Sequence, residues 1–162
     1  MRERVVPGPG QESVWDYPRP PRVEDSPRRV RIVVGGVTVV DTRSAKRVLE
    51  TSSPPVFYVP ATDVSGELRQ VGGTTFCEWK GTATYFDVAG GDQVARRAAW
   101  TYREPTAGYD ALAGHIAFYP GRVDACYLDD ELVRPQASDY YGGWVTDDIV
   151  GPFKGQRGTE GW

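Results

Sequence analysis

The stretch Val30-Arg31-Ile32-Val33-Val34-Gly35-Gly36-Val37-Thr38-Val39-Val40-Asp41 gives the most direct prediction of the fold. Two runs rich in β-branched residues flank a pair of glycines, a pattern typical of two antiparallel strands joined by a tight turn. Glycine suits the turn because it adopts the positive φ angles that two-residue hairpin loops require. We therefore expect a β-hairpin at these residues.

Further short runs of β-branched and aromatic residues indicate more strands, separated by turn residues such as Pro54-Pro55, Gly90-Gly91 and Pro120-Gly121. The expected strands cover residues 47–50, 56–59, 82–88, 94–102, 115–119 and 123–127. No window sustains a helical apolar period, so helix is expected only as brief turns at 61–64 and 109–113. The sequence thus predicts an all-β fold of two packed antiparallel sheets.

The two ends of the chain differ in composition from its centre. Residues 1–28 hold six of the 13 prolines, which disfavours regular structure and favours an extended arm. Residues 135–162 are dense in glycine and aromatic residues but lack strand alternation. We expect irregular straps at 1–28 and 135–162 around a β domain at 29–134. Because ordering a strap costs conformational entropy, Trp15 and Trp144 are expected to be buried against the domain.

The charge balance limits the classes of partner. A net charge of -3 and a sequence pI near 5.2 provide no basic excess for a polyphosphate backbone, so no nucleic-acid partner is expected. The longest nearly apolar run, residues 32–40, is too short to span a bilayer, and no secretory signal pattern is present. We expect a soluble, cytoplasmic protein without a membrane partner.

Two cysteines and one histidine argue against a metal or disulfide framework. Cys77, Cys126 and His115 fall short of the usual four zinc ligands unless carboxylates join them. A Cys77 nucleophile would require His115 as its base, since the chain has no other imidazole. Reduced, structural thiols and no cofactor are the favoured interpretation.

One segment gathers more chemical groups than any other. It reads Thr75-Phe76-Cys77-Glu78-Trp79-Lys80-Gly81-Thr82-Ala83-Thr84-Tyr85 and matches no metal, phosphate or triad signature. Lys80 precedes a glycine and follows an indole, so its amine is placed to leave a tight turn and bind an anionic group. The alternatives are a solvated lysine in a hairpin turn and an ion pair with Glu50 or Asp41.

Two carboxylate clusters bear on nucleotidyl transfer, a reaction that needs carboxylates to hold magnesium. The clusters are Asp129-Asp130-Glu131 and Asp147-Asp148. The first is expected in a turn after a strand, and Gly35-Gly36 joins strands where the phosphate-binding glycine motifs open a helix. Solvated turns are therefore the favoured interpretation of the acidic residues.

The order of several motifs resembles the bacterial and fungal domain of unknown function DUF427. The motifs are Asp41-Thr42-Arg43-Ser44, Val48-Leu49-Glu50-Thr51, Pro55-Val56-Phe57-Tyr58-Val59-Pro60, Asp63-Val64, Thr75-Phe76-Cys77, Lys80-Gly81, Ala99-Trp100-Thr101-Tyr102, Pro105, Gly114 and Ala117-Phe118-Tyr119. The resemblance covers about Val30 to Tyr127. It implies a small β-tent-like fold and, weakly, a nucleotidyltransferase activity.

The sequence departs from the common DUF427 pattern at one position. Glu78 stands where that pattern has proline after the cysteine, a feature that resembles an actinobacterial branch of the family. The same branch carries Trp144 and the tail Pro152-Phe153-Lys154-Gly155. The cysteine pairs that hold zinc in other β-tent domains are missing from the sequence.

The leading functional hypothesis is binding of a small anionic or planar ligand in a cleft between the sheets. Lys80 is the expected charge partner, with Glu50 or Tyr58 as orienting hydrogen-bond groups. Trp79, Tyr85, Trp100 and Tyr102 are the expected walls; Trp100 and Tyr102 alternate along one strand and therefore share a face. Two alternatives stay open: an enzyme acting on a nucleotide-like substrate, and a protein-interaction module that uses the C-terminal strap.

We predict that Cys77 and Cys126 both titrate as free thiols after denaturation. The two cysteines lie on separate expected strands, and the ligand count is too low for a tetrahedral zinc site. Chelator should leave the melting temperature unchanged. Stoichiometric zinc by elemental analysis, or fewer than two free thiols in protein purified from a reducing cell, would contradict this prediction.

Overall fold

The hairpin predicted around Gly35-Gly36 forms in the computed structural model, which describes residues 3–162. Strand β3 (Val30–Val34) pairs with β4 (Val37–Thr42). Gly35 and Gly36 have φ angles of 62° and 77°, as the tight turn requires. A Cβ on Gly35 would lie 2.0 Å from the carbonyl oxygen of Gly90. The turn therefore needs glycine both for its backbone and for its close approach to a neighbouring strand.

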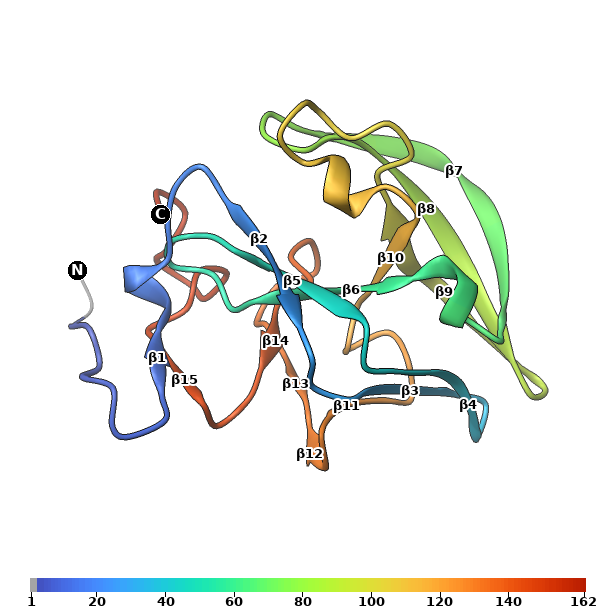
Figure 1. Ribbon diagram of the computed structural model, residues 1–162, viewed down its shortest axis with the longest axis horizontal. Helices are drawn as coiled ribbons and strands as arrows, with labels where there is room; N and C mark the ends of the chain where they lie inside the picture. Colours follow the sequence, from blue (N-terminus) through green and yellow to red (C-terminus); the bar gives the residue numbers. More distant parts are fainter. Residues whose placement is uncertain (1–2) are drawn as a thin grey trace.

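Two antiparallel sheets form the body of the protein (Figure 1). The smaller has the order β12-β11-β3-β4 and adds β11 (Ala125–Leu128) and β12 (Glu131–Leu132) to the hairpin. The larger has the order β2-β5-β6-β10-β9-β8-β7. Its strands are β2 (Arg22–Ser26), β5 (Ala45–Leu49), β6 (Val56–Pro60), β7 (Glu67–Cys77), β8 (Gly81–Gly90), β9 (Gln93–Thr101) and β10 (His115–Phe118). The expected all-β fold of packed antiparallel sheets is confirmed.

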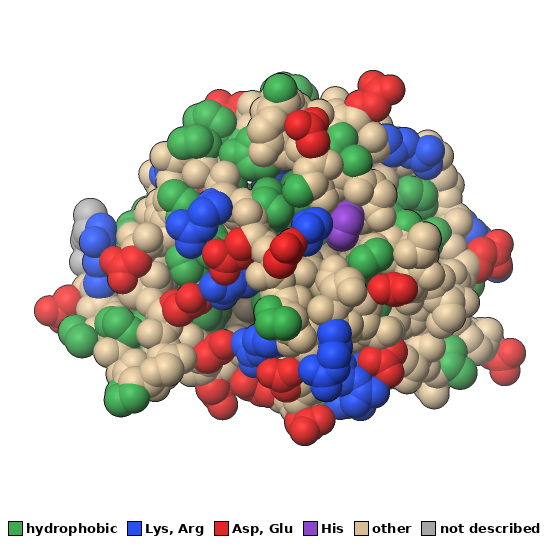
Figure 2. All heavy atoms as spheres, in the orientation of Figure 1, with side chains coloured by type: hydrophobic (Ala, Val, Ile, Leu, Met, Phe, Trp, Pro, Cys, Tyr) green, Lys and Arg blue, Asp and Glu red, His purple; other side chains and the backbone are tan. Residues whose placement is uncertain are grey.

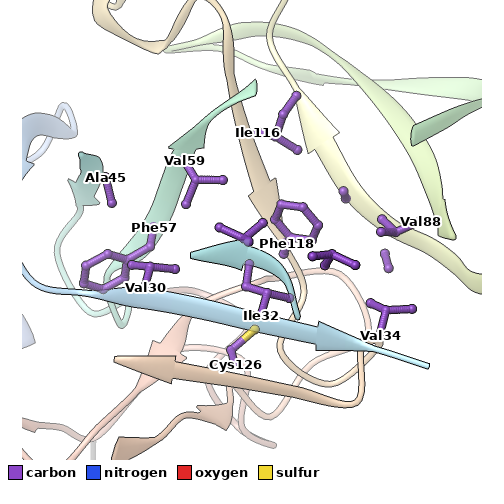
Figure 3. Packing of buried hydrophobic residues seen from close by; sticks show 14 of the residues in the cluster. Val30, Ile32, Val34, Ala45, Phe57, Val59, Val88, Ile116, Phe118 and Cys126 are labelled. Carbon is purple, nitrogen blue, oxygen red and sulfur yellow. The ribbon is translucent and has the colours of Figure 1, made fainter. Parts of the chain in front are cut away.

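The main hydrophobic core lies between the two sheets. Its side chains are mostly aliphatic and come from alternate positions of the facing strands, as Figure 3 shows. They include Val30, Ile32 and Val34 of β3, Phe57 and Val59 of β6, Val88 of β8, Ile116 and Phe118 of β10, and Cys126 and Leu128 of β11. Because side chains alternate along a strand, the residues between these positions on β6 and β10 lie on the far face of the larger sheet.

Short elements complete the structure. The two-residue strands β1 (Glu12–Ser13) and β15 (Ile149–Val150) pair in parallel, and β13 (Arg134–Pro135) pairs with β14 (Trp144–Val145). Single 3₁₀ turns occur at η1 (Val14–Asp16), η2 (Ala61–Asp63) and η3 (Asp110–Leu112). The last two lie where brief helical turns were expected. Among residues 3–162, no helix has the length and apolar character needed to cross a membrane.

Besides the two-residue strands, two longer strands occur where none was expected. β7 contains Gly72-Gly73, which resembles a turn in the sequence, but the structure places these residues at a register shift between Gln70 and Thr74. β2 lies between Pro21 and Pro27 at one edge of the larger sheet. Edge strands tolerate flanking prolines and charged residues. β2 therefore lacks the alternation of hydrophobic and polar residues by which the other strands were predicted.

The two tryptophans expected to pin the straps behave differently. Trp144 is 1% exposed, stacks near Phe57 at 5.1 Å between ring centroids, and donates from Nε1 to the Phe118 carbonyl oxygen at 3.1 Å. Its predicted burial is confirmed. Trp15 is only half-buried; its Nε1 donates to the Pro152 carbonyl oxygen at 2.9 Å. The N-terminal strap is thus held partly by the C-terminal strap.

We predict that Trp144→Ala lowers the free energy of unfolding by about 3–5 kcal/mol, because it empties a large, fully buried volume. Denaturant melts measure the change. Phe76 is 72% exposed, so Phe76→Ala is the matched aromatic control and should stay within about 0.5 kcal/mol of the parent. Equal effects of the two substitutions would contradict the assignment of Trp144 as the anchor of the C-terminal strap.

Candidate functional site

A cavity of about 250 Å³ lies on the outer face of the larger sheet. Tyr58 of β6 lines this cavity, whereas its neighbours Phe57 and Val59 belong to the core between the sheets. The same alternation separates Trp100 from Ala99 on β9. The expectation of a cleft between the two sheets is therefore wrong. Mostly aliphatic side chains fill the space between the sheets, and the aromatic residues of the cavity lie on the opposite face of the larger sheet.

All seven residues singled out from the sequence line this one cavity: Glu50, Tyr58, Trp79, Lys80, Tyr85, Trp100 and Tyr102. They come from distant parts of the chain, namely the end of β5, the strands β6, β8 and β9, and the turn between β7 and β8. The antiparallel order of the larger sheet brings these segments to one face. The structure thus gathers the candidate residues around one cavity.

The floor of the cavity is a cluster of aromatic rings. The Trp100 ring lies 4.5 Å from that of Tyr119 and 6.2 Å from that of Tyr58, between centroids. Trp100 Nε1 donates a hydrogen bond to Tyr58 Oη at 3.3 Å. The hydroxyls of Tyr85 and Thr75 lie 2.7 Å apart. These contacts fix the ring positions, so the floor is preformed.

Burial keeps several floor hydroxyls protonated. Desolvation raises the pKa of Tyr58, Tyr102 and Tyr119 well above the usual value for a phenol. A phenolate loses more hydration on burial than a neutral phenol does, which accounts for the direction of the shift. These groups therefore remain uncharged hydrogen-bond donors or acceptors even at a pH where an exposed phenol ionises.

Lys80 is the cation next to this floor. It lies in the turn between β7 and β8, directly before Gly81, whose φ is 113°. Its Nζ is 5.8 Å from the centroid of the Tyr102 ring. The two carboxylates considered as partners pair elsewhere: Glu50 lies 3.7 Å from Arg19 Nε, and Asp41 lies 2.7 Å from Arg29 Nη2. The ion-pair alternative for Lys80 is therefore wrong.

The C-terminal strap supplies cavity residues that the sequence interpretation missed. They are Gln136, Tyr140, Tyr141, Gly142 and Lys154, and Tyr119 at the end of β10 was missed as well. A possible signal was the segment Tyr140-Tyr141-Gly142-Gly143, since adjacent glycines allow close approach of a backbone. A Cβ on Gly142 would lie 2.4 Å from the Trp100 ring. Glycine at this position therefore lets the strap lie directly on the aromatic floor.

The acidic clusters considered for magnesium binding are engaged with arginines. Arg28 contacts Asp129 at 2.9 Å and Asp148 at 2.5 Å, and Arg134 contacts Asp147 at 2.9 Å. None of these carboxylates lines the cavity. Within residues 3–162, no three His, Cys, Asp or Glu side chains are grouped to hold a metal ion. Figure 2 likewise shows acidic and basic side chains interspersed over the face in view.

The cysteines and the histidine occupy separate places. Cys77 is half-buried and lines the cavity, and Cys126 is buried in the main core, where desolvation raises the pKa of its thiol. Both are free thiols. His115 is not part of the cavity lining, and its Nδ1 lies 3.0 Å from the Ala113 carbonyl oxygen. The imidazole therefore has a local structural contact, and the arrangement does not resemble a Cys–His pair.

We predict that stability falls as the pH rises above about 10, the ordinary phenol value. The unfolded tyrosines ionise first because the folded-state pKa of Tyr102 is raised. The stabilisation is therefore complete below pH 10 and lost as the pH rises toward the folded-state value. Denaturant melts across this range should show a shallower loss in Tyr102→Phe. An identical pH slope in the two proteins would contradict a raised pKa for Tyr102.

One comparison bears on the family. The family model described as "Domain of unknown function (DUF427)" matches residues 22–129, about two thirds of the chain. No protein with a curated description matches the sequence. The matched residues run from β2 to the end of β11 and include the whole larger sheet, with every cavity residue that the sequence predicted. Because one family model spans the sheet and those residues, the chain belongs to the DUF427 family.

Proposed function

We propose that the protein binds a small, planar, anionic ligand in the cavity on the outer face of the larger sheet. The observation that carries the proposal is the combination of an aromatic floor with two ammonium groups, those of Lys80 and Lys154, in one enclosure of about 250 Å³. Cavities with mostly apolar walls and a few convergent polar groups are typical small-molecule sites.

Charge favours an anion. The chain has only three lysines, and two of them line this cavity; the third, Lys46, pairs with Asp25 at 2.6 Å. The salt bridges among residues 3–162 include neither Lys80 nor Lys154. Glu50 and Glu78 also line the cavity, but Arg19 lies next to the Glu50 carboxylate, and the Glu78 side chain is exposed to solvent. The two ammonium groups are therefore the cations of the cavity lining that remain for an anionic ligand.

The walls favour a flat ligand. Trp79, Tyr85, Trp100 and Tyr102 present ring surfaces to the cavity, and aromatic faces and edges pack well against other planar groups. The preformed floor reduces the ordering cost of binding, because its rings are already held by mutual contacts. A single-ring or two-ring carboxylate is consistent with the cavity volume.

The two other hypotheses have less support. An enzyme using magnesium would need grouped carboxylates, whereas among residues 3–162 no three His, Cys, Asp or Glu side chains are grouped to hold a metal ion, and Asp129, Asp147 and Asp148 contact arginines outside the cavity. An interaction module is favoured by one observation: Tyr140 is 54% exposed and Tyr141 37%. Both residues also line the cavity, so exposure at its rim is equally consistent with ligand entry.

The test is a titration of planar carboxylates, benzoate and naphthoate, against their neutral carboxamides, followed by calorimetry and by shifts of the Trp79 and Lys80 resonances. We expect the carboxylates to bind more tightly. Lys80→Met should weaken benzoate about tenfold or more, because a charge-assisted contact contributes roughly 1.5–3 kcal/mol.

Lys46→Met is the matched control, since it removes an equal charge outside the cavity. It should leave the affinity for benzoate unchanged. Equal affinity for benzoate and benzamide, or resonance shifts confined to residues away from the cavity, would refute the proposal. Binding that requires a divalent metal would favour the nucleotide-directed enzyme.

A further inference from the structure

We propose that Lys154 of the C-terminal strap is the second ligand-binding cation, so that the cavity prefers planar ligands with two negative charges to those with one. The inference rests on the proposed function and extends it, because it specifies the charge of the ligand and the segment of the chain that recognises this charge. It also assigns a role to residues 135–162, which lie outside the family match at 22–129.

Lys154 and Lys80 line the cavity from different parts of the chain, the C-terminal strap and the turn between β7 and β8. The Nζ of Lys154 lies 4.8 Å from the centroid of the Tyr141 ring, whereas the Nζ of Lys80 lies over Tyr102. Both side chains are half-buried, and neither has a carboxylate within salt-bridge distance among residues 3–162. Each ammonium group therefore lies over a separate aromatic ring and forms no salt bridge within residues 3–162.

The backbone of Lys154 is fixed at both of its polar atoms. Its N–H donates to the Ser52 carbonyl oxygen at 2.7 Å, and its carbonyl oxygen accepts from Gln136 Nε2 at 2.6 Å. Gln136 is 5% exposed, and its Oε1 accepts from the Gly143 N–H at 3.0 Å. One buried amide thus joins the two parts of the strap that line the cavity, and Gln136 is a positioning residue for Lys154.

Electrostatics connects this geometry to ligand charge. Two ammonium groups in an enclosure of about 250 Å³ repel each other, and the repulsion is stronger in a partly buried site than in water. Arg19 lies beside Glu50, and the side chain of Glu78 is exposed at the rim. A planar dianion relieves the repulsion at both lysines, whereas a monoanion relieves it at one.

The test compares benzoate with terephthalate, a planar dianion of similar width, by isothermal titration calorimetry. We expect the parent protein to bind terephthalate at least about tenfold more tightly than benzoate, the gain of one further charge-assisted contact. In Lys154→Met the preference should fall to about twofold, the statistical factor for two equivalent carboxylates. Lys154→Arg should restore most of it, and Lys46→Met should retain all of it.

The outcomes separate this inference from the proposed function. If Lys154→Met keeps the full preference while benzoate binds as in the parent, Lys154 is not the second cation and the proposed function stands. If the parent binds neither benzoate nor terephthalate saturably, the proposed function fails and this inference with it. A parent protein that binds both probes equally would refute the dianion preference alone.

Gln136→Met tests the positioning role, because it removes both amide contacts while keeping a side chain of similar size. We expect the terephthalate preference to drop toward that of Lys154→Met, with a smaller effect on benzoate. Circular dichroism and a melting curve check that the variant is folded. A folded Gln136→Met protein with an unchanged ratio of the two affinities would refute the positioning role.

Discussion

Burial of both faces of the seven-stranded sheet is the constraint on which the rest of the structure depends. An antiparallel sheet commonly packs one face on the core and leaves the other solvated. Here β9 and β10 end in runs of buried residues with no alternation. The inner face is aliphatic and meets the smaller sheet, while the outer face presents Tyr58, Tyr85 and Trp100. Such a face requires a cover, and irregular segments provide it.

Two segments cover the outer face, and each is held by specific contacts. The segment after β9 contributes Leu112, which is fully buried, and Tyr109, whose hydroxyl donates to the Pro21 carbonyl oxygen at 2.8 Å. The C-terminal strap is anchored through Trp144 in the main core and Gln136 near the cavity. Burying these side chains offsets the entropy lost when irregular backbone is ordered. Of the two segments, the C-terminal strap is the one that lines the cavity.

Local signals accounted for most strands and for the candidate residues on them. β-branched runs and glycine pairs predicted the hairpin, and the stretch around Lys80 predicted part of the cavity lining. β7 was missed because Gly72-Gly73 resembles a turn. The face of the sheet that holds the cavity was predicted wrongly for a different reason. Alternation along the strand indicates that Trp100 and Tyr102 share a face, but it does not indicate which layer of the structure covers that face. Lys154 and Gln136 were missed because long-range contacts of an irregular strap leave no periodic pattern.

The chemistry of the cavity follows from how the cover is made. Phenols are uncharged at neutral pH, and burial raises the pKa of Tyr58 and Tyr102 further, so the floor adds no negative charge. The cations come from the edges, with Lys80 on the turn that borders the sheet and Lys154 on the strap that closes it. A floor of neutral phenols and a rim of ammonium groups together complement a flat anion. Because one of the two cations belongs to the C-terminal strap, the proposed ligand preference depends on a segment outside the family match.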